Sequence, residues 1–185
     1  MGFDFKGKRV VVAGGSRGIG RSIALGFAAA GAQVSICARG ADALAATRAD
    51  IARHGGLAHA APCDLADAAD VARYVAEAQA ALGGIDILVN NASGFGMGDD
   101  EAGWAASLQV DVMAMVRASH AALPALLANA ATGSCIVHLT SISGLRPSAR
   151  SAAYAAAKAA MISYTGSQAA MLARQGVRVN AIAPG

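Results

Sequence analysis

A tyrosine and a lysine interrupt an alanine-rich run near the end of the chain, "SAAYAAAKAA" at 151–160. Alanine is the best helix former, so the run predicts a helix, and residues four positions apart lie on one helix face. A free phenol titrates near pH 10, and a nearby ammonium favours the phenolate. Tyr154 and Lys158 therefore have the spacing of a general acid/base pair. A packing helix with one solvated polar edge is the alternative.

A second candidate is the glycine-rich turn in "VVVAGGSRGIGRSIA", which joins an apolar run to a helical segment. Glycines let the backbone turn tightly and approach a phosphate, whose charge is met by the amides of a helix N-terminus. The spacing differs from the common G-x-G-x-x-G fingerprint. We nevertheless favour a phosphate-binding turn, formed by Gly14, Ser16, Arg17, Gly18, Ile19 and Gly20.

The same letters permit a different chemistry. "GGSRG" at 14–18 satisfies G-x-S-x-G, the nucleophile elbow of α/β-hydrolases, with Ser16 as the nucleophile. Against a hydrolase, the preceding strand is the first of the chain, and none of the four histidines falls in an obvious late loop. A glycine turn that binds no ligand is the remaining alternative.

The second apolar run ends in "ICAR", where a carboxylate would bind the ribose 2′-hydroxyl of NAD. The sequence offers Arg39 there instead, and Arg17 lies in the glycine turn. Guanidinium groups pair well with phosphate oxygens, so the two arginines favour NADP(H) over NAD(H). Two unrelated surface arginines are the alternative.

The elements that must position these residues alternate along the chain. Alternation of buried strands with helices predicts a doubly wound α/β fold, in which a parallel sheet is covered on both faces. Ligands bind such sheets at the carboxyl ends of the strands, where the polar clusters of this sequence fall. We expect strands over 9–14, 33–38, 57–65, 85–92, 133–141 and 177–185, and helices over 18–31, 41–55, 67–83, 100–130 (one or two) and 152–175.

Composition narrows the class of protein. The 185 residues predict one domain over 1–185, and a net charge of +3 with 4% aromatic residues gives little support to nucleic-acid binding. The uncharged stretch after Arg117 contains proline, asparagine and glycine, so no membrane span is expected. Three scattered cysteines without metal-ligand spacing fit reduced thiols in the cytoplasm and no metal site.

Several motifs in order give the chain a family resemblance. They are "AGGSRGIG" (13–20), "CDL" (63–65), "NNAS" (90–93), "TSISG" (140–144), "YAAAK" (154–158) and "VNAIAPG" (179–185). The sequence resembles the short-chain dehydrogenases/reductases from about Lys8 onward. The resemblance implies a Rossmann-like sheet ordered 3-2-1-4-5-6, a nicotinamide cofactor, and hydride transfer between a carbonyl and an alcohol.

The resemblance also implies roles for individual residues. Tyr154 is expected to be the general acid/base and Lys158 its activator, which would also bind the nicotinamide ribose. Ser141, thirteen residues before the tyrosine, is expected to hold the substrate oxygen. The further residues expected around the cofactor are Asp64 and Leu65 beside the adenine, Asn90 and Ala92 along the groove, and Pro184 and Gly185.

The sequence departs from the family pattern in three places. Ser93 stands where the family usually has the glycine of N-N-A-G. Asp111 occupies the position at which many members have an asparagine that supports a proton relay, so we count Asp111 among the catalytic candidates. The chain also stops at Gly185, before the substrate-covering loop and seventh strand expected from the resemblance, which suggests a truncated member.

These observations predict an NADP(H)-dependent oxidoreductase that interconverts a ketone and a secondary alcohol. Candidate substrates include 3-oxoacyl thioesters, and Phe95, Met97, Leu145 and Arg146 are expected to line the substrate pocket. The alanine-rich helices at roughly 106–130 and 152–175 are expected to form a homodimer or homotetramer. The main alternative is an inactive or weakly active NADP-binding fragment or sensor.

Overall fold

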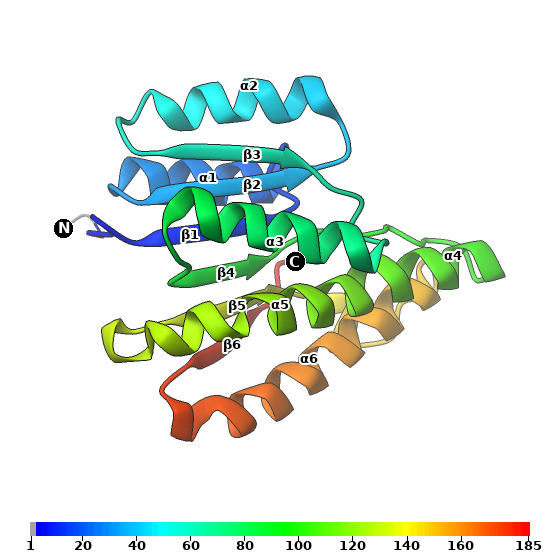
Figure 1. Ribbon diagram of the computed structural model, residues 1–185. Coiled ribbons are helices and arrows are strands. Elements are labelled where there is room, and N and C mark those ends of the chain that lie inside the picture. Colours follow the sequence, from blue (N-terminus) through cyan, green and yellow to red (C-terminus); the bar gives the residue numbers. More distant parts are fainter. Residues whose placement is uncertain (1–2) are drawn as a thin grey trace.

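The computed structural model describes residues 3–185, which form a six-stranded parallel sheet with helices on both faces (Figure 1). The strand order is β3-β2-β1-β4-β5-β6, so the predicted doubly wound topology is confirmed. The strands are β1 (Arg9–Ala13), β2 (Gln33–Ala38), β3 (Ala58–Pro62), β4 (Ile87–Asn90), β5 (Cys135–Leu139) and β6 (Arg178–Ile182). The main helices are α1 (Gly18–Ala29), α2 (Ala41–Ala52), α3 (Ala68–Leu82), α4 (Glu101–Ala106), α5 (Ala114–Ala128) and α6 (Ala152–Leu172).

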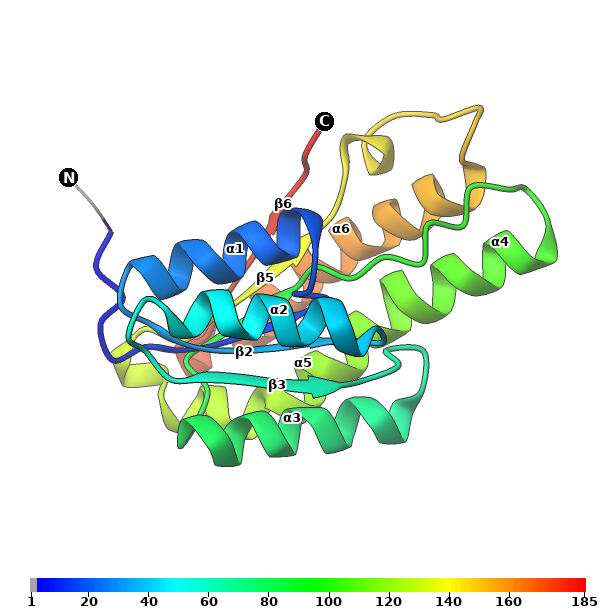
Figure 2. The same ribbon diagram turned by 90° about the horizontal axis from the view of Figure 1, so that it is seen from above.

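Alternating side chains of the buried strands face two separate cores. Val10 and Val12 of β1 pack with α1 and α2, whereas Val11 and Ala13 pack with α3 and α5. Figure 2 shows α2 and α3 on opposite sides of the strands. Since successive side chains of a strand point to opposite faces, an apolar run without alternation fits a sheet covered on both sides.

Local signals set the limits of α3. The Asp67 side chain accepts a hydrogen bond from the Asp70 amide at 2.8 Å, as expected of an N-cap. The helix ends at Gly83, whose φ of +73° is the left-handed conformation that glycine adopts readily. The predicted helix over 67–83 is therefore confirmed to within one residue at each end.

The helical segment that begins at Glu101 contains a π-helical turn, η1 (Ser107–Met113), between α4 and α5. The whole stretch Glu101–Ala128 is long and apolar enough to span a membrane by length and composition. However, α5 packs against α3 and buries Ala118, Ala122 and Leu126, so this part of the stretch is a core helix. The π turn places Asp111 in the interior.

Candidate active site

A groove of about 820 Å³ opens at the carboxyl ends of the strands, where the loops after β1 to β5 meet the start of α6. This is the edge at which doubly wound sheets bind ligands. The structure brings together most of the polar residues that follow the strands in sequence. The predicted site residues that line the groove are Gly14, Ser16, Arg17, Gly18, Ile19, Arg39, Asp64, Leu65, Ala92, Ser141, Tyr154, Lys158 and Pro184.

The glycine turn is a close-packed cradle at one part of this groove. A Cβ on Gly14 would lie 2.9 Å from the Ala92 Cα, and a Cβ on Gly20 would clash with the Gly14 carbonyl and the Asn91 amide. The Asn91 Nδ2 donates to that same carbonyl at 2.8 Å and holds the turn. Because α1 begins at Gly18 without a side-chain cap, its first amides are available to an anion. The turn therefore fits a pyrophosphate.

Two arginines line the groove at this turn: Arg17 belongs to the turn itself, and Arg39 follows β2, whose Cys37 carbonyl accepts hydrogen bonds from the Gly14 and Gly15 amides. Arg17 and Arg39 are exposed and line the groove. Within residues 3–185, neither guanidinium forms an ion pair with a carboxylate. Asp64 and Leu65, which follow β3, line the same region. The groove can therefore hold an adenosine group that carries an additional phosphate.

The wall formed by β5 and α6 carries the acid/base candidates. Ser141 follows β5, and its Oγ accepts a hydrogen bond from the Ser143 amide at 3.1 Å. Tyr154 lies in the first turn of α6 and is half-buried. The Lys158 Nζ is 5.4 Å from the centroid of the Tyr154 ring. The spacing of four residues therefore brings the ammonium and the phenol together on the groove.

Lys158 is buried, and protein atoms surround its ammonium. The Nζ donates to the Leu139 carbonyl at 2.9 Å and to the Met161 Sδ at 3.5 Å, and lies 2.9 Å from the Asp111 Oδ1. The contact with Oδ1 lacks hydrogen-bond geometry and is an ion pair. The other oxygen, Oδ2, accepts from the Gly94 amide at 3.0 Å. Asp111 is thus in direct contact with the lysine.

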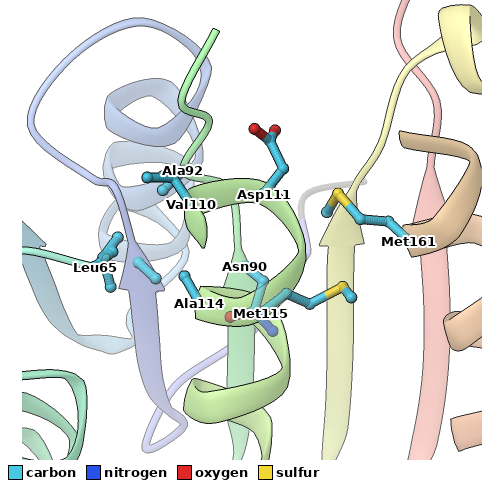
Figure 3. Close-up of a pocket in the computed structure, with 9 residues that line it drawn as sticks. Leu65, Asn90, Ala92, Val110, Asp111, Ala114, Met115 and Met161 are labelled. Atoms are coloured by element: carbon cyan, nitrogen blue, oxygen red, sulfur yellow. The ribbon is translucent and has the colours of Figure 1, made fainter. Parts of the chain in front are cut away.

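Asn90 does not line the groove itself. It lines an adjoining cavity of about 10 Å³, the space of about one water molecule, which shares Leu65, Ala92 and Val110 with the groove. Figure 3 shows the Asp111 carboxylate pointing away from Asn90 at this cavity. The Asn90 Nδ2 is 3.2 Å from the Ser119 Oγ and 3.1 Å from the His138 Nδ1. Burial lowers the pKa of His138, and a contact with Gln168 partly opposes this effect.

The residues that line the groove differ from the residues expected from the sequence at a few further positions. Gly20 and Gly185 do not line the groove, and neither do Met97, Leu145 and Arg146. Asn91 and Thr140 line it although they were not predicted. Asn91 belongs to the motif "NNAS" and Thr140 to the motif "TSISG", so the sequence motifs could have indicated both residues. Among residues 3–185, no histidine lines the groove that holds Ser16, so the histidine that a Ser–His–Asp triad requires does not lie beside Ser16 there.

The parallel sheet, the glycine-rich turn and the Ser–Tyr–Lys set are typical of nucleotide-dependent oxidoreductases. A model of the short chain dehydrogenase family matches residues 8–185, and the chain belongs to this family. The chain is accordingly an NAD(P)-dependent oxidoreductase that acts on CH–OH and C=O groups.

Curated relatives and solved structures agree with this assignment. The chain is 37% identical to sorbitol dehydrogenase of Cereibacter sphaeroides, over 97% of this chain and 70% of the relative. It is 36% identical to the rhamnolipids biosynthesis 3-oxoacyl-[acyl-carrier-protein] reductase of Pseudomonas aeruginosa, over 99% and 74%. A short chain dehydrogenase from Burkholderia cenocepacia in complex with NADP has a TM-score of 0.90 and 40% identity, with coverage of 97% of this chain and 74% of that one.

Proposed function

We propose that the chain interconverts a ketone and a secondary alcohol, with NADP(H) as the preferred cofactor. The observation that carries the proposal is the composition of one groove. Tyr154, Lys158 and Ser141 share one wall of the groove, while Arg17 and Arg39 line it beside the phosphate turn. Proton transfer and recognition of a charged dinucleotide are therefore possible in one continuous space.

The proposed mechanism assigns one step to each polar group. Reduction places negative charge on the carbonyl oxygen, and a nicotinamide cofactor supplies the hydride when it is bound. The Ser141 hydroxyl donates a hydrogen bond to that oxygen, and the Tyr154 hydroxyl donates the proton. The ammonium of Lys158, 5.4 Å from the phenol ring, stabilises the phenolate that remains. In the oxidative direction the phenolate accepts the proton.

Asp111 is proposed to act through Lys158 as a positioning residue. Its two oxygens contact the ammonium and the Gly94 amide, so the carboxylate connects α6 to the loop after β4. Together with the Leu139 carbonyl, it fixes the Nζ atom at the rear of the groove. The carboxylate also offsets part of the lysine charge, which an asparagine would not do.

The preference for NADP(H) rests on this chain's own arginines. Similar solved structures hold either cofactor: the Burkholderia protein contains NADP, whereas a 7α-hydroxysteroid dehydrogenase with 32% identity contains NADH. Arg17 and Arg39 offer two free guanidinium groups, and no carboxylate stands at the end of β2. Such a pair suits a 2′-phosphate better than a 2′-hydroxyl.

The substrate is a small molecule that carries a ketone or a secondary alcohol. The names of the relatives cover a sugar alcohol and a 3-oxoacyl thioester, so both chemistries are candidates. We keep the 3-oxoacyl thioester as one proposal and test it beside simple ketones.

The same proposal includes a homo-oligomer in the cytoplasm. Trp104, Leu108 and Met113 expose apolar surface along the segment from α4 to α5, with exposed fractions of 37%, 43% and 37%. A second copy packed on this surface would cover it, and sedimentation velocity at micromolar concentration checks for the dimer. The three cysteines are free and buried, which suits a reducing compartment.

The decisive experiment follows the absorbance of the reduced cofactor while ketones and a 3-oxoacyl thioester are added in turn. We expect substrate-dependent oxidation with a higher kcat/KM for NADPH than for NADH. Equal values would contradict the preference. If the chain binds NADPH but no carbonyl compound supports its oxidation, the proposal of an enzyme is contradicted and the alternative of an inactive NADP-binding sensor is favoured.

A further inference from the structure

The loop after β4 has an unusual backbone conformation at Phe95. Its φ is +48°, and no other non-glycine residue in the described range 3–185 has a positive φ. The left-handed region is unfavourable for an L-residue with a bulky side chain. Strained residues of this kind persist when the surrounding structure fixes them, and they gather at functional sites.

Contacts on both sides of Phe95 fix this conformation. A Cβ on Gly94 would clash with the Ala106 carbonyl, and a Cβ on Gly96 would clash with the Gly103 carbonyl, so both glycines lie directly on the helical segment. The Phe95 amide donates to the Ser93 Oγ at 3.2 Å. Ser93 is the residue that departs from the N-N-A-G pattern, and its hydroxyl stabilises the turn that presents Phe95.

The Phe95 ring lies beside the proton donor. Its centroid is 6.2 Å from that of Tyr154, and the ring planes differ by 7°, which is an offset-stacked arrangement. Phe95 lines the groove and remains 65% exposed. The fixed backbone and the stack therefore present an apolar, flat surface next to the hydroxyl that must contact the carbonyl oxygen.

We propose that Phe95 determines substrate specificity by stacking on an aromatic ring attached to the carbonyl carbon. The substrate class is then the aryl ketones and the corresponding aryl carbinols. This inference rests on the proposed function, because Tyr154 and Ser141 must hold the carbonyl oxygen for its substituent to reach Phe95. A planar ring gains the stacking interaction, which a saturated ring of similar size cannot make in the same way.

The test compares acetophenone with cyclohexyl methyl ketone, which differ in the saturation of the ring. The kcat/KM ratio of the two ketones is measured for the wild type and for Phe95→Leu, so that their intrinsic reactivities cancel. Leucine keeps an apolar side chain but removes the flat face, and we expect the ratio to fall roughly threefold to tenfold. Phe95→Tyr keeps the flat ring and should keep the ratio. A ratio that is unchanged in Phe95→Leu would overturn the proposal.

A binding measurement separates this proposal from the proposed function. Saturation-transfer NMR with NADP⁺ present reports contact between protein and ketone without turnover. If none of the ketones supports oxidation of NADPH by the wild type, the proposed function fails. The NMR signal of the acetophenone ring then still tests whether the ring stacks on Phe95. A signal that weakens in Phe95→Leu but not in Phe95→Tyr supports the role of Phe95. Equal signals in all three proteins, or no signal in any of them, would overturn it.

Discussion

Lys158 and Asp111 form an ion pair in the interior, with exposed side-chain fractions of 2% and 0%. Removing a single partner from such a pair is more damaging than removing both, because the remaining charge loses its compensation inside the protein. Asp111 accepts a hydrogen bond from the Gly94 amide, and Lys158 donates hydrogen bonds to the Leu139 carbonyl and the Met161 Sδ. The pair therefore links catalysis to folding stability at one position.

This coupling predicts the stability of two variants. Lys158→Met leaves the Asp111 carboxylate buried without its cation and should lower the free energy of unfolding by about 3–5 kcal/mol. Adding Asp111→Asn removes the orphaned charge and should restore a large part of this loss. Chemical denaturation measures both proteins. A double variant no more stable than Lys158→Met would show that the ion pair is not the cause.

Arg39 carries the prediction on cofactor preference. Arg39→Ala should weaken NADPH binding roughly tenfold or more, because a hydrogen bond between charged groups contributes about 1.5–3 kcal/mol. NADH lacks the 2′-phosphate, so its affinity should change little. Isothermal titration with both cofactors measures the difference, and Arg150→Ala, an exposed arginine outside the groove, controls for net charge. Equal losses for both cofactors would contradict a 2′-phosphate contact.

At the scale of the elements, α1 and the glycine turn depend on a close approach at Gly20. A side chain at this position would meet the Gly14 carbonyl and the Asn91 amide, both of which are held by the same hydrogen bond. Gly26 lies on the same helix, and a Cβ at that position would have no atom within 4 Å. Close packing therefore requires a glycine at position 20 but not at position 26 of the same helix.

The matched substitutions should have opposite effects. Gly20→Ala should lower both the melting temperature and the affinity for NADPH, because the turn must move to admit the methyl group. Gly26→Ala should raise the free energy of unfolding by roughly 0.5–1 kcal/mol, since alanine is the better helix former. Thermal unfolding with and without NADPH measures both effects. A Gly20→Ala protein that binds NADPH normally would rule out the close approach as a requirement.

The π-helical turn over Ser107–Met113 is a feature that the sequence pattern did not predict. The apolar pattern over 100–130 predicts helix but leaves open whether there are one or two. The turn buries Asp111, whose carboxylate pairs with the ammonium of Lys158 from another helix. Helical periodicity describes the near neighbours along one segment and carries no information about this partner.

At the scale of the whole molecule, the parallel sheet and the groove at one of its edges were predictable from the alternation of elements, whereas the strand order was predicted from the family resemblance. Apolar strands separated by helices run parallel, so their carboxyl ends, and the polar residues after each strand, meet at one edge. Asn90 is not among the residues that line the groove, and its contacts, Ser119 and His138, come from α5 and β5. Such contacts across the core are a product of packing, and the sequence around Asn90 does not reveal them.

The buried network around His138 should make stability depend on pH. Burial lowers the pKa of His138 in the folded state, so below about pH 6.5 the unfolded chain takes up a proton that the folded chain does not. The free energy of unfolding should therefore decrease as the pH is lowered, by at most about 1.4 kcal/mol per pH unit for this group. The melting temperature of the wild type should decrease from about pH 7.5 to pH 5.5, and the melting temperature of His138→Gln should decrease less. The same decrease in both proteins would exclude His138 as a source.

The most direct test of the whole account is the turnover of Tyr154→Phe measured beside its affinity for NADPH. Phenylalanine keeps the ring next to Phe95 and removes only the hydroxyl that donates the proton. We expect the rate of ketone reduction to fall by about a hundredfold to ten-thousandfold, the usual contribution of general acid catalysis, while NADPH binding stays nearly unchanged. Ketone reduction at the normal rate by Tyr154→Phe would contradict the assignment of Tyr154 as the proton donor.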